Sequence, residues 1–581
     1  MSNNRIKIPD KIKRNFRSNT LNFIFVISYV NIFQFIFGAE NSIVGVIFAI
    51  MMSASMIRDL TATPLRHLVV QALVMVWMAL AACLVTVLTA PLAFMINFIT
   101  LLMILYSFTF EYSSHMYFPY ILSYLFLIFI SPVSPQHLPK RLLGMLAGAL
   151  SIILYQWFMG RKRVAETAKD MLSEMIDCIV QYISFRLKET GKIPDPADIH
   201  KKLSRLSQAV YDRRKKVLCI SDASFSMIDA GRGLEHLLIL MKELPDTSPV
   251  QTRAILLTIA DYLELFRRFL QQEITELPSC KYSDFLAACD ETTAGLFYHA
   301  VDDTRDRLLH MSDPQNKVRY RKTATSFKIR IQAAIDLSPV RAVYALRTAF
   351  LLSSATLLVH LLSLPHGRWL LFTLASVSLP YADDVSVKMK KRIAATVIGG
   401  LVSVLIYSLV PSPAGRTAVM MLSGYVSFYF DDYTETFACS TVGALGGAVF
   451  LNAVGFPAVG SVFIIRLGYI LAGAAVAYTV NCLLFPYRRT MATRHLWKKY
   501  KHITTLLTET CLSDQVDTQL YYNLVIQAYL LETKLTQNAH LDEWSEFPSV
   551  LKSCQEQVFK AHRKFITART DAPVFNPGHL S

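Results

Sequence analysis

Two long stretches of the chain, residues 21–160 and 342–487, are apolar almost throughout and are broken only by short polar segments. A helix needs roughly 20 apolar residues to cross a bilayer, so each stretch predicts about six transmembrane helices. In the first stretch the segments are Leu21–Phe37, Ile43–Ile57, His67–Leu88, Leu92–Phe110, Met116–Ile130 and Leu142–Met159. In the second they are Ala345–Leu362, Trp369–Leu379, Ile393–Val410, Thr417–Phe430, Phe437–Val454 and Val462–Phe485. The shorter ones would sit inside the bundle or be lengthened by interfacial residues.

The rest of the chain has the pattern of soluble helices. Charged residues are frequent, and apolar residues recur at helical spacing, for example at Ile255, Ile259 and Leu263. Proline and glycine separate the helical segments. We therefore predict one soluble helical domain at residues 161–341 and another at residues 488–581, the latter ending in a disordered tail rich in proline and glycine.

One register relates the two apolar stretches. Arg141-Leu-Leu-Gly-Met-Leu-Ala-Gly148 matches Arg466-Leu-Gly-Tyr-Ile-Leu-Ala-Gly473 at an offset of 325 residues. Chance similarity of apolar runs would not align charges and prolines, but the same offset pairs Pro132 with Pro457, Asp59 with Asp384, Arg66 with Lys391 and Arg163 with Arg488. The fold class expected is an all-α membrane protein with two parallel-repeat six-helix bundles, each followed by a helical domain. Many transporters build a binding site between two such halves.

The charge balance indicates an orientation. The formal net charge is +16, and only 18% of residues are charged, against about 25% in soluble proteins. Lysine and arginine cluster beside the apolar runs, including the basic segment 1–20, and by the positive-inside rule they mark the cytoplasmic side. We expect an uncleaved N-terminus and both soluble domains in the cytoplasm of a cell that carries the protein in its plasma or inner membrane. Nucleic acid is the other partner that a basic chain suggests, but no zinc-finger or RNP-type motif is present, so none is expected.

Motifs for catalysis or cofactor binding are missing from the sequence. There is no G-x-x-x-x-G-K-[ST] loop for a nucleotide-driven pump, no H-E-x-x-H and no G-x-S-x-G. None of the nine cysteines forms a C-x-x-C pair, which argues against a disulfide framework or a metal site. We predict that the protein is not an enzyme and uses no cofactor.

Four polar residues at matched positions are candidates for a substrate pathway. Arg141 and Arg466 begin the last predicted helix of each repeat, where an arginine near hydrocarbon is costly unless it pairs or reaches water. They either anchor the helix at the interface or present one cation from each half to a shared path for anions. Gln156 and Asn481 lie late in the same two helices, where each amide either bonds a neighbouring helix or lines the path.

Four acidic residues near predicted helix ends are candidates for proton coupling. Asp59 and Asp384 correspond to each other in the two repeats, whereas Glu111 and Glu435 occupy the loop before the fifth predicted helix of their repeat. Acids at membrane depth are frequent proton relays. The alternative is that they neutralise neighbouring basic residues or belong to an acidic cytoplasmic loop.

Small residues recur at spacings that allow close helix contact. The glycines concerned are Gly144, Gly148, Gly399, Gly400, Gly443, Gly447 and Gly473. Spacings such as Gly-x-x-x-Gly let two helix backbones approach closely in a membrane. We therefore predict packing surfaces at these positions.

The second apolar stretch resembles the fusaric acid resistance-like (FUSC) family of membrane transporters. The resemblance is carried by Trp369 to Pro380, by Lys391-Arg392-Ile-Ala-Ala-Thr-Val-Ile-Gly-Gly400, and by Arg466 with Gly473, Asn481 and Phe485-Pro486. It implies export of aromatic carboxylic acids driven by the proton-motive force. A more distant resemblance, to plant aluminium-activated malate transporters, implies an anion path formed by two six-helix blocks.

Two functions follow as hypotheses. The first is a membrane transporter that exports small organic or aromatic carboxylate anions, with the lipid bilayer and the anion as its partners, and with a periplasmic adaptor if the cell has an outer membrane. The alternative is a membrane scaffold or regulatory protein whose soluble helices bind a partner. If the purified protein showed no transport and residues 161–341 alone bound a partner stoichiometrically, the alternative would be favoured.

Overall fold

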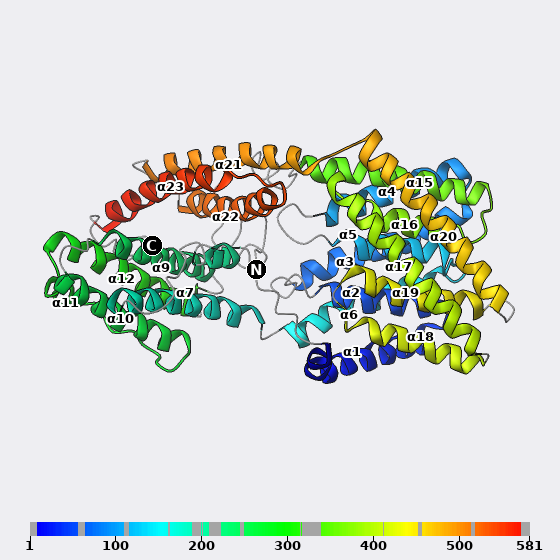
Figure 1. Ribbon diagram of the computed structural model, residues 1–581, viewed down its shortest axis with the longest axis horizontal. Coiled ribbons are helices and arrows are strands. Elements are labelled where there is room, and N and C mark those ends of the chain that lie inside the picture. Colours follow the sequence, from blue (N-terminus) through cyan, green and yellow to red (C-terminus); the bar gives the residue numbers. More distant parts are fainter. Residues whose placement is uncertain are drawn as a thin grey trace, which may run out of the picture. The chain divides into compact units, whose positions relative to one another are not determined.

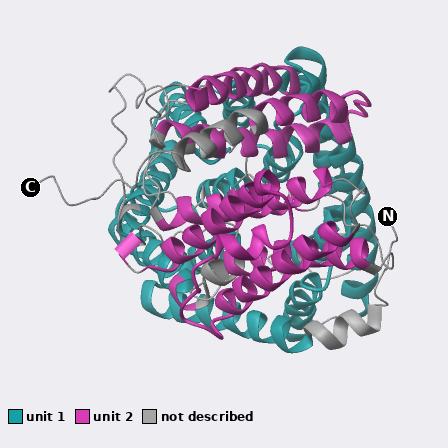
Figure 2. Ribbon diagram, turned by 90° about the vertical axis from the view of Figure 1, so that its left-hand side faces the viewer, with its two compact units in different colours: residues 1–57, 64–156, 337–492 teal, residues 58–63, 157–336, 493–581 magenta. Residues whose placement is uncertain are grey.

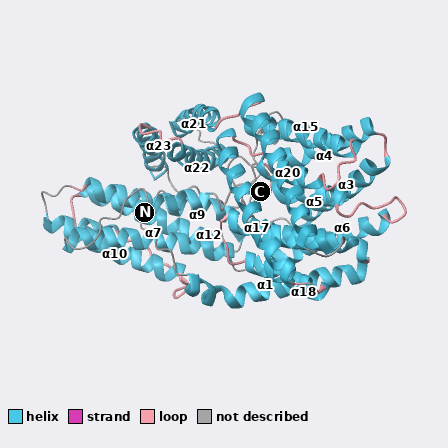
Figure 3. Cartoon of the chain, turned by 45° about the vertical axis from the view of Figure 1, so that its right-hand side comes forward, coloured by secondary structure: helices cyan, strands magenta, loops and turns pink. Residues whose placement is uncertain are grey.

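The computed structural model describes residues 8–55, 64–109, 116–160, 163–188, 199, 201–207, 222–244, 249–313, 315–316, 338–410, 412–430, 432–450, 456–512 and 518–570. All regular elements in these ranges are helices, joined by short loops (Figure 3). The predicted all-α fold class is therefore confirmed for this part of the chain. Two compact units can be distinguished, one of residues 1–57, 64–156 and 337–492, and one of residues 58–63, 157–336 and 493–581 (Figure 2).

The first unit contains six helices from each apolar stretch within the described ranges (Figure 1). Those of the first stretch are α1 (Ile8–Phe37), α2 (Ser42–Ser55), α3 (Pro64–Val87), α4 (Ala90–Phe108), α5 (Tyr117–Phe129) and α6 (Leu138–Gly160). Those of the second are α15 (Pro339–Leu361), α16 (Arg368–Val377), α17 (Ala382–Leu409), α18 (Pro413–Ser427), α19 (Tyr433–Phe450) and α20 (Phe456–Tyr478), which a π-helical segment, Thr479–Leu484, extends.

Not every one of these helices is long enough to cross a bilayer. Among the described residues, seven helices have the length and the composition for it, in α1, α3, α4, α6, α15, α17 and α20. The apolar helices α2, α5 and α16 are shorter, with 14, 13 and 10 residues. Seven of the ten residues of α16 are buried, whereas Phe35 on α1 is 90% exposed and Ile464 on α20 is 68% exposed. Several long helices thus present apolar residues outward, as lipid contact requires, while α16 forms part of the interior.

The two blocks of helices contact each other within the first unit. Helix α15 lies along α4, where Arg341 donates to the Tyr106 carbonyl oxygen at 2.6 Å and its guanidinium lies 4.5 Å from the Tyr106 ring centroid. Helix α1 contacts α18, where the hydroxyl oxygens of Thr20 and Tyr425 are 2.8 Å apart. At the offset of 325 residues, α1 corresponds to α15 and α4 corresponds to α18. The contact between α1 and α18 is therefore the counterpart of the contact between α15 and α4. This is the arrangement that two repeats about one axis would have, although the duplication itself stays a prediction.

Glycines mark the tightest helix contacts of the second block. A Cβ atom at Gly399 would meet the Ala438 carbonyl oxygen and lie 2.8 Å from the Cβ atom of Thr441 on α19. At Gly400 it would meet the Phe463 ring of α20. At Gly148, in the first block, an added Cβ atom would likewise meet the Phe48 ring. At the remaining predicted packing glycines the distance from an added Cβ atom to the nearest heavy atom is longer: 3.1 Å at Gly473, 3.3 Å at Gly144, 3.4 Å at Gly443 and 3.6 Å at Gly447.

Replacing Gly399 with alanine should destabilise the first unit by about 1–3 kcal/mol, because the backbone of α19 must move away from the added methyl group. The matched control is Gly443→Ala on α19, where the nearest side-chain atom is at an ordinary contact distance of 3.4 Å. Thermal unfolding of the detergent-solubilised protein measures the difference. Equal melting temperatures for the two variants would contradict the close packing of α17 on α19.

The second unit joins both soluble stretches. Its elements within the described ranges are α7 (Arg163–Lys188), α9 (Asp222–Glu243), α10 (Pro249–Leu270), α11 (Tyr282–Leu286), α12 (Glu291–Ser312), most of α21 (Arg489–Leu512), α22 (Thr518–Leu541) and α23 (Phe547–Thr570). The buried Arg232 on α9 donates to the hydroxyl of Tyr521 on α22, and Gln555 on α23 donates to Glu532 on α22 at 2.5 Å. The bond from Arg232 therefore connects α22 to α9, and the bond from Gln555 connects α23 to α22.

Candidate functional site

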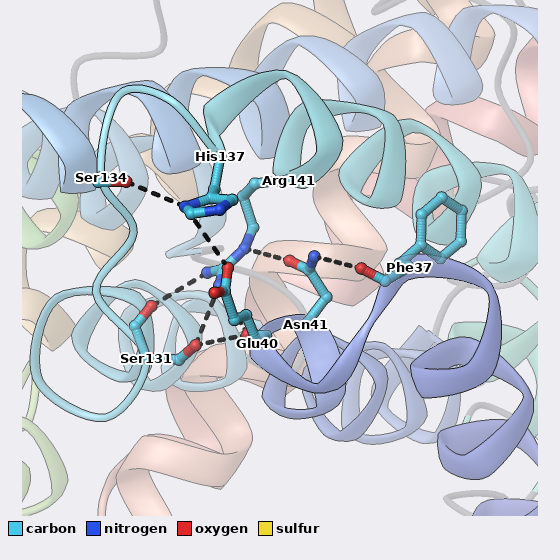
Figure 4. A network of polar contacts seen from close by, with 7 residues as sticks. All are labelled: Phe37, Glu40, Asn41, Ser131, Ser134, His137 and Arg141. Carbon is cyan, nitrogen blue, oxygen red and sulfur yellow. Dashed lines mark hydrogen bonds and ion pairs between the residues drawn. The ribbon is translucent and has the colours of Figure 1, made fainter.

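Arg141 is held by acceptors on every side of its guanidinium (Figure 4). It is 2% exposed on α6, and it donates to Asn41 Oδ1 at 2.5 Å, to the Glu40 carbonyl oxygen at 2.8 Å and to Ser131 Oγ at 2.9 Å. Asn41 in turn donates to the Phe37 carbonyl oxygen at 2.8 Å. These bonds connect the α1–α2 junction to the α5–α6 loop, so Arg141 ties together the ends of four helices.

Arg466, the residue matched to Arg141, has different surroundings. It is 5% exposed on α20, its guanidinium lies 5.2 Å from the Trp369 ring centroid, and its Nε atom has no hydrogen-bond partner in the described part of the chain. The reason can be read in the sequence. At the offset of 325 residues, Asn41 is replaced by His366 and Ser131 by Phe456, so the second block lacks these acceptors.

A second buried arginine, Arg392, belongs to the same part of the block. It lies on α17, is 6% exposed, and has its guanidinium 4.6 Å from the Phe437 ring centroid of α19. Its Nε atom has no hydrogen-bond partner among the described residues, and its polar neighbour is the Tyr433 phenol. One turn earlier, Lys388 Nζ lies 3.4 Å from the Tyr433 ring centroid.

We call Trp369, Arg392, Phe437 and Arg466 the arginine–aromatic cluster. Its residues come from α16, α17, α19 and α20, which the glycine contacts bring together. The charges of Arg392 and Arg368 act on Arg466, and no carboxylate pairs with Arg392 or Arg466 in the described residues. Two buried cations without an anion are costly, which is the electrostatic situation that a bound anion relieves.

The two candidate amides bond neighbouring helices. Gln156 Nε2 donates to the Ser55 carbonyl oxygen at the end of α2, and Asn481 Nδ2 donates to Ser378 Oγ at 3.2 Å, just after α16. Both amides therefore hold the C-terminal end of the short second helix of their block. The Asn481 Oδ1 atom is buried without a hydrogen-bond partner among the described residues, and a role of either amide in lining a path stays a prediction.

Neither of the two acidic candidates within the described residues forms an ion pair there with an arginine of the cluster, and the other two lie outside the described residues. Asp384, in the first turn of α17, forms an ion pair with Arg489, whose backbone N–H donates to Asp383 at 2.6 Å. Glu435 is exposed in the first turn of α19. Asp59 and Glu111 fall outside the described residues, so their proposed role in proton coupling stays a prediction.

Sequence reasoning missed Arg392 as a site residue because it placed the start of the helix too late. The expected span began at Ile393, which put Arg392 in a cytoplasmic basic cluster, but α17 begins at Ala382. At 1.5 Å per residue, Arg392 then lies roughly 15 Å along the helix. The signal that was available is the unbroken helical pattern from Asp383 onward, with acidic residues in the first turn, as helix N-termini favour.

Residues 354–480 match the family model described as fusaric acid resistance protein-like. This match confirms the FUSC resemblance of the second block and spans the whole arginine–aromatic cluster. No curated protein and no solved structure matched the chain. Together with the apolar helices, the match fits a multi-pass membrane transporter.

Proposed function

We propose that the protein exports small aromatic carboxylate anions across the cell membrane, driven by the proton-motive force, and that the arginine–aromatic cluster binds the anion. The observation that supports this most is the pair of buried guanidinium groups, Arg392 and Arg466, whose Nε atoms have no acceptor among the described residues and which lie over aromatic rings. The family match over the same block supports transport as the activity.

The chemistry of the cluster suits this cargo. A guanidinium presents a planar fork of N–H donors that fits a carboxylate, and it forms stronger hydrogen bonds than a neutral donor. Trp369 and Phe437 add ring faces and edges that attract another aromatic ring beyond the effect of buried area. A planar aromatic carboxylate therefore satisfies both features of the cluster at once, whereas a short aliphatic anion satisfies only the charge.

The orientation is part of the proposal. The basic N-terminal segment 1–20 and the second unit would face the cytoplasm, as the positive-inside rule predicts, and a periplasmic adaptor would join where the cell has an outer membrane. Cytoplasmic substrate would then enter from the side on which α17 and α19 begin.

The flux of labelled carboxylates into proteoliposomes tests the proposal. We expect 4-hydroxybenzoate to be carried faster than acetate, with both compared against protein-free vesicles because the protonated acids cross lipid unaided. Flux that never exceeds the protein-free background would contradict transport, and equal acceleration of the two anions would contradict aromatic recognition.

Replacing Trp369 with leucine should lower the preference for 4-hydroxybenzoate over acetate by up to about tenfold, since an aromatic pair is worth about 0.5–1.5 kcal/mol. The control is Trp157→Leu on α6, because Trp157 is 43% exposed and lies outside the cluster. The ratio of the two initial rates is the readout. An unchanged ratio in the Trp369 variant would remove this ring from the site.

A further inference from the structure

Helix α21 begins a few residues after the last apolar helix of the second block ends. The apolar span runs to Leu484, and a link of residues 485–488 connects it to α21. Leu483, Leu484 and Phe485 at the end of the span are 64%, 61% and 60% exposed. Outward-facing apolar residues on a spanning helix contact lipid. The first turns of α21 therefore follow directly on the part of the chain that leaves the bilayer.

The exposed face of these first turns is cationic. Basic residues follow one another at spacings of four and three residues, which places them on one side of the helix. They are Arg494, Lys498 and Lys501, and all three are exposed. The first acidic residue of the helix is Glu509, about two turns beyond Lys501. We call Arg494, Lys498 and Lys501 the basic face of α21.

The neighbouring carboxylates contact the opposite side of α21. Asp542 accepts from the Thr493 hydroxyl at 3.3 Å, and Glu532 on α22 accepts from the Tyr500 hydroxyl at 3.4 Å. Thr493 and Tyr500 are buried. Packing of the second unit thus uses the side of α21 that carries Thr493 and Tyr500, and the basic face is left to an anion outside the chain.

Helix geometry places the three cations at increasing distances from the end of the span. At 1.5 Å per residue, Arg494 lies about 8 Å along α21 from Arg489, and Lys501 lies about 18 Å along it. The headgroup layer of a bilayer is roughly 5–8 Å thick, and its charge acts over about another 8 Å at physiological salt. Arg494 is therefore the cation of the basic face that lies nearest to the headgroups along the chain.

We infer that the basic face of α21 binds the headgroups of anionic phospholipids at the membrane surface where the last span ends. Basic clusters that directly follow a transmembrane helix recognise such lipids through charge. A nucleic acid also fits a row of cations, but the short link to a membrane span favours a lipid as the partner. This binding does not depend on which cargo the protein carries.

The test is a titration of the detergent-solubilised full-length protein with phosphatidylglycerol, in which native mass spectrometry counts the bound lipids. Phosphatidylcholine with the same acyl chains is the neutral comparison. Each lysine or arginine at an anionic lipid surface raises the affinity about fivefold. The Arg494→Gln/Lys498→Gln/Lys501→Gln variant should therefore lower the preference for phosphatidylglycerol about fivefold if one cation contacts headgroups, and about 100-fold if all three do.

Two further variants separate lipid binding by this face from a general effect of charge or packing. Arg494→Lys/Lys498→Arg/Lys501→Arg retains the three charges and should retain the preference. Lys201→Gln/Arg205→Gln/Arg253→Gln removes three exposed cations elsewhere in the second unit and should leave the preference unchanged. An unchanged preference in the glutamine variant of α21, or an equal fall in the variant of Lys201, Arg205 and Arg253, would overturn the inference.

Two other ligands distinguish the lipid from other anions. Glycerol phosphate at the lipid's concentration should not compete, because it lacks the acyl chains that hold a headgroup beside the helix; effective competition would assign the face to free phosphate esters. A short single-stranded oligonucleotide should bind the wild type and the glutamine variant equally. If the variant lost the oligonucleotide and kept phosphatidylglycerol, the face would bind a nucleic acid and the inference would be wrong.

Discussion

Replacing Arg392 and Arg466 together with glutamine should lower the flux of 4-hydroxybenzoate about 100-fold or more. Hydrogen bonds to charged groups contribute about 1.5–3 kcal/mol each, and every 1.4 kcal/mol corresponds to about a tenfold change. The loss of two guanidinium partners therefore removes most of the binding energy for a small carboxylate. The measurement is the initial rate of uptake into proteoliposomes at equal protein content.

The same double variant should keep or raise its melting temperature, because it removes two buried charges for which the described chain offers no carboxylate. This separates a binding role from a structural one. Arg253→Gln on α10 is the control for lost charge, since Arg253 is exposed in the second unit. If the double variant transported at the normal rate, the arginine–aromatic cluster would have no part in transport.

Replacing Arg141 with alanine should have the opposite result, a large loss of stability with little loss of flux in the protein that remains folded. The change leaves Asn41 Oδ1 and the Ser131 carbonyl oxygen without their donor, while the Glu40 carbonyl oxygen keeps the bond from the Ser131 hydroxyl. Asn41 is buried, and a buried acceptor left unpaired costs about 1–3 kcal/mol, so the free energy of unfolding should fall by about 2 kcal/mol or more.

The matched control for this change is Lys140→Ala, which removes the neighbouring, exposed cation. Thermal unfolding in detergent gives the stability, and flux per folded molecule gives the activity. A normal melting temperature combined with abolished flux in the Arg141 variant would place the anion path at Arg141 and refute the structural role given to it.

The helices could be predicted from the sequence because their signal is local. Six apolar segments in each stretch and the breaks between them follow from hydropathy, and the structure has six helices at those places in each block. The starts of some long helices were less predictable. Helix α1 begins at Ile8 and not at Leu21, and α17 begins at Ala382 and not at Ile393, because a hydropathy pattern does not record the polar first turns of a helix.

The different roles of Arg141 and Arg466 could not be predicted from their matching positions. The acceptors of Arg141 come from Asn41 and Glu40, about a hundred residues earlier in the chain, and only the folded structure brings them to α6. The sequence did contain a usable sign, because His366 and Phe456 replace two of the acceptors in the second block. Comparing the residues at the acceptor positions of the two repeats, as well as the two arginines, would have distinguished the hydrogen-bonded Arg141 from Arg466.

The most direct test of the anion site is a structure of the protein in lipid nanodiscs with 4-iodobenzoate, whose iodine atom identifies the ligand. We predict the carboxylate within hydrogen-bonding distance of Arg392 or Arg466 and the iodinated ring against Trp369 or Phe437. Ligand found only beside Arg141 or in the second unit, or both cluster arginines paired with protein carboxylates, would contradict the account.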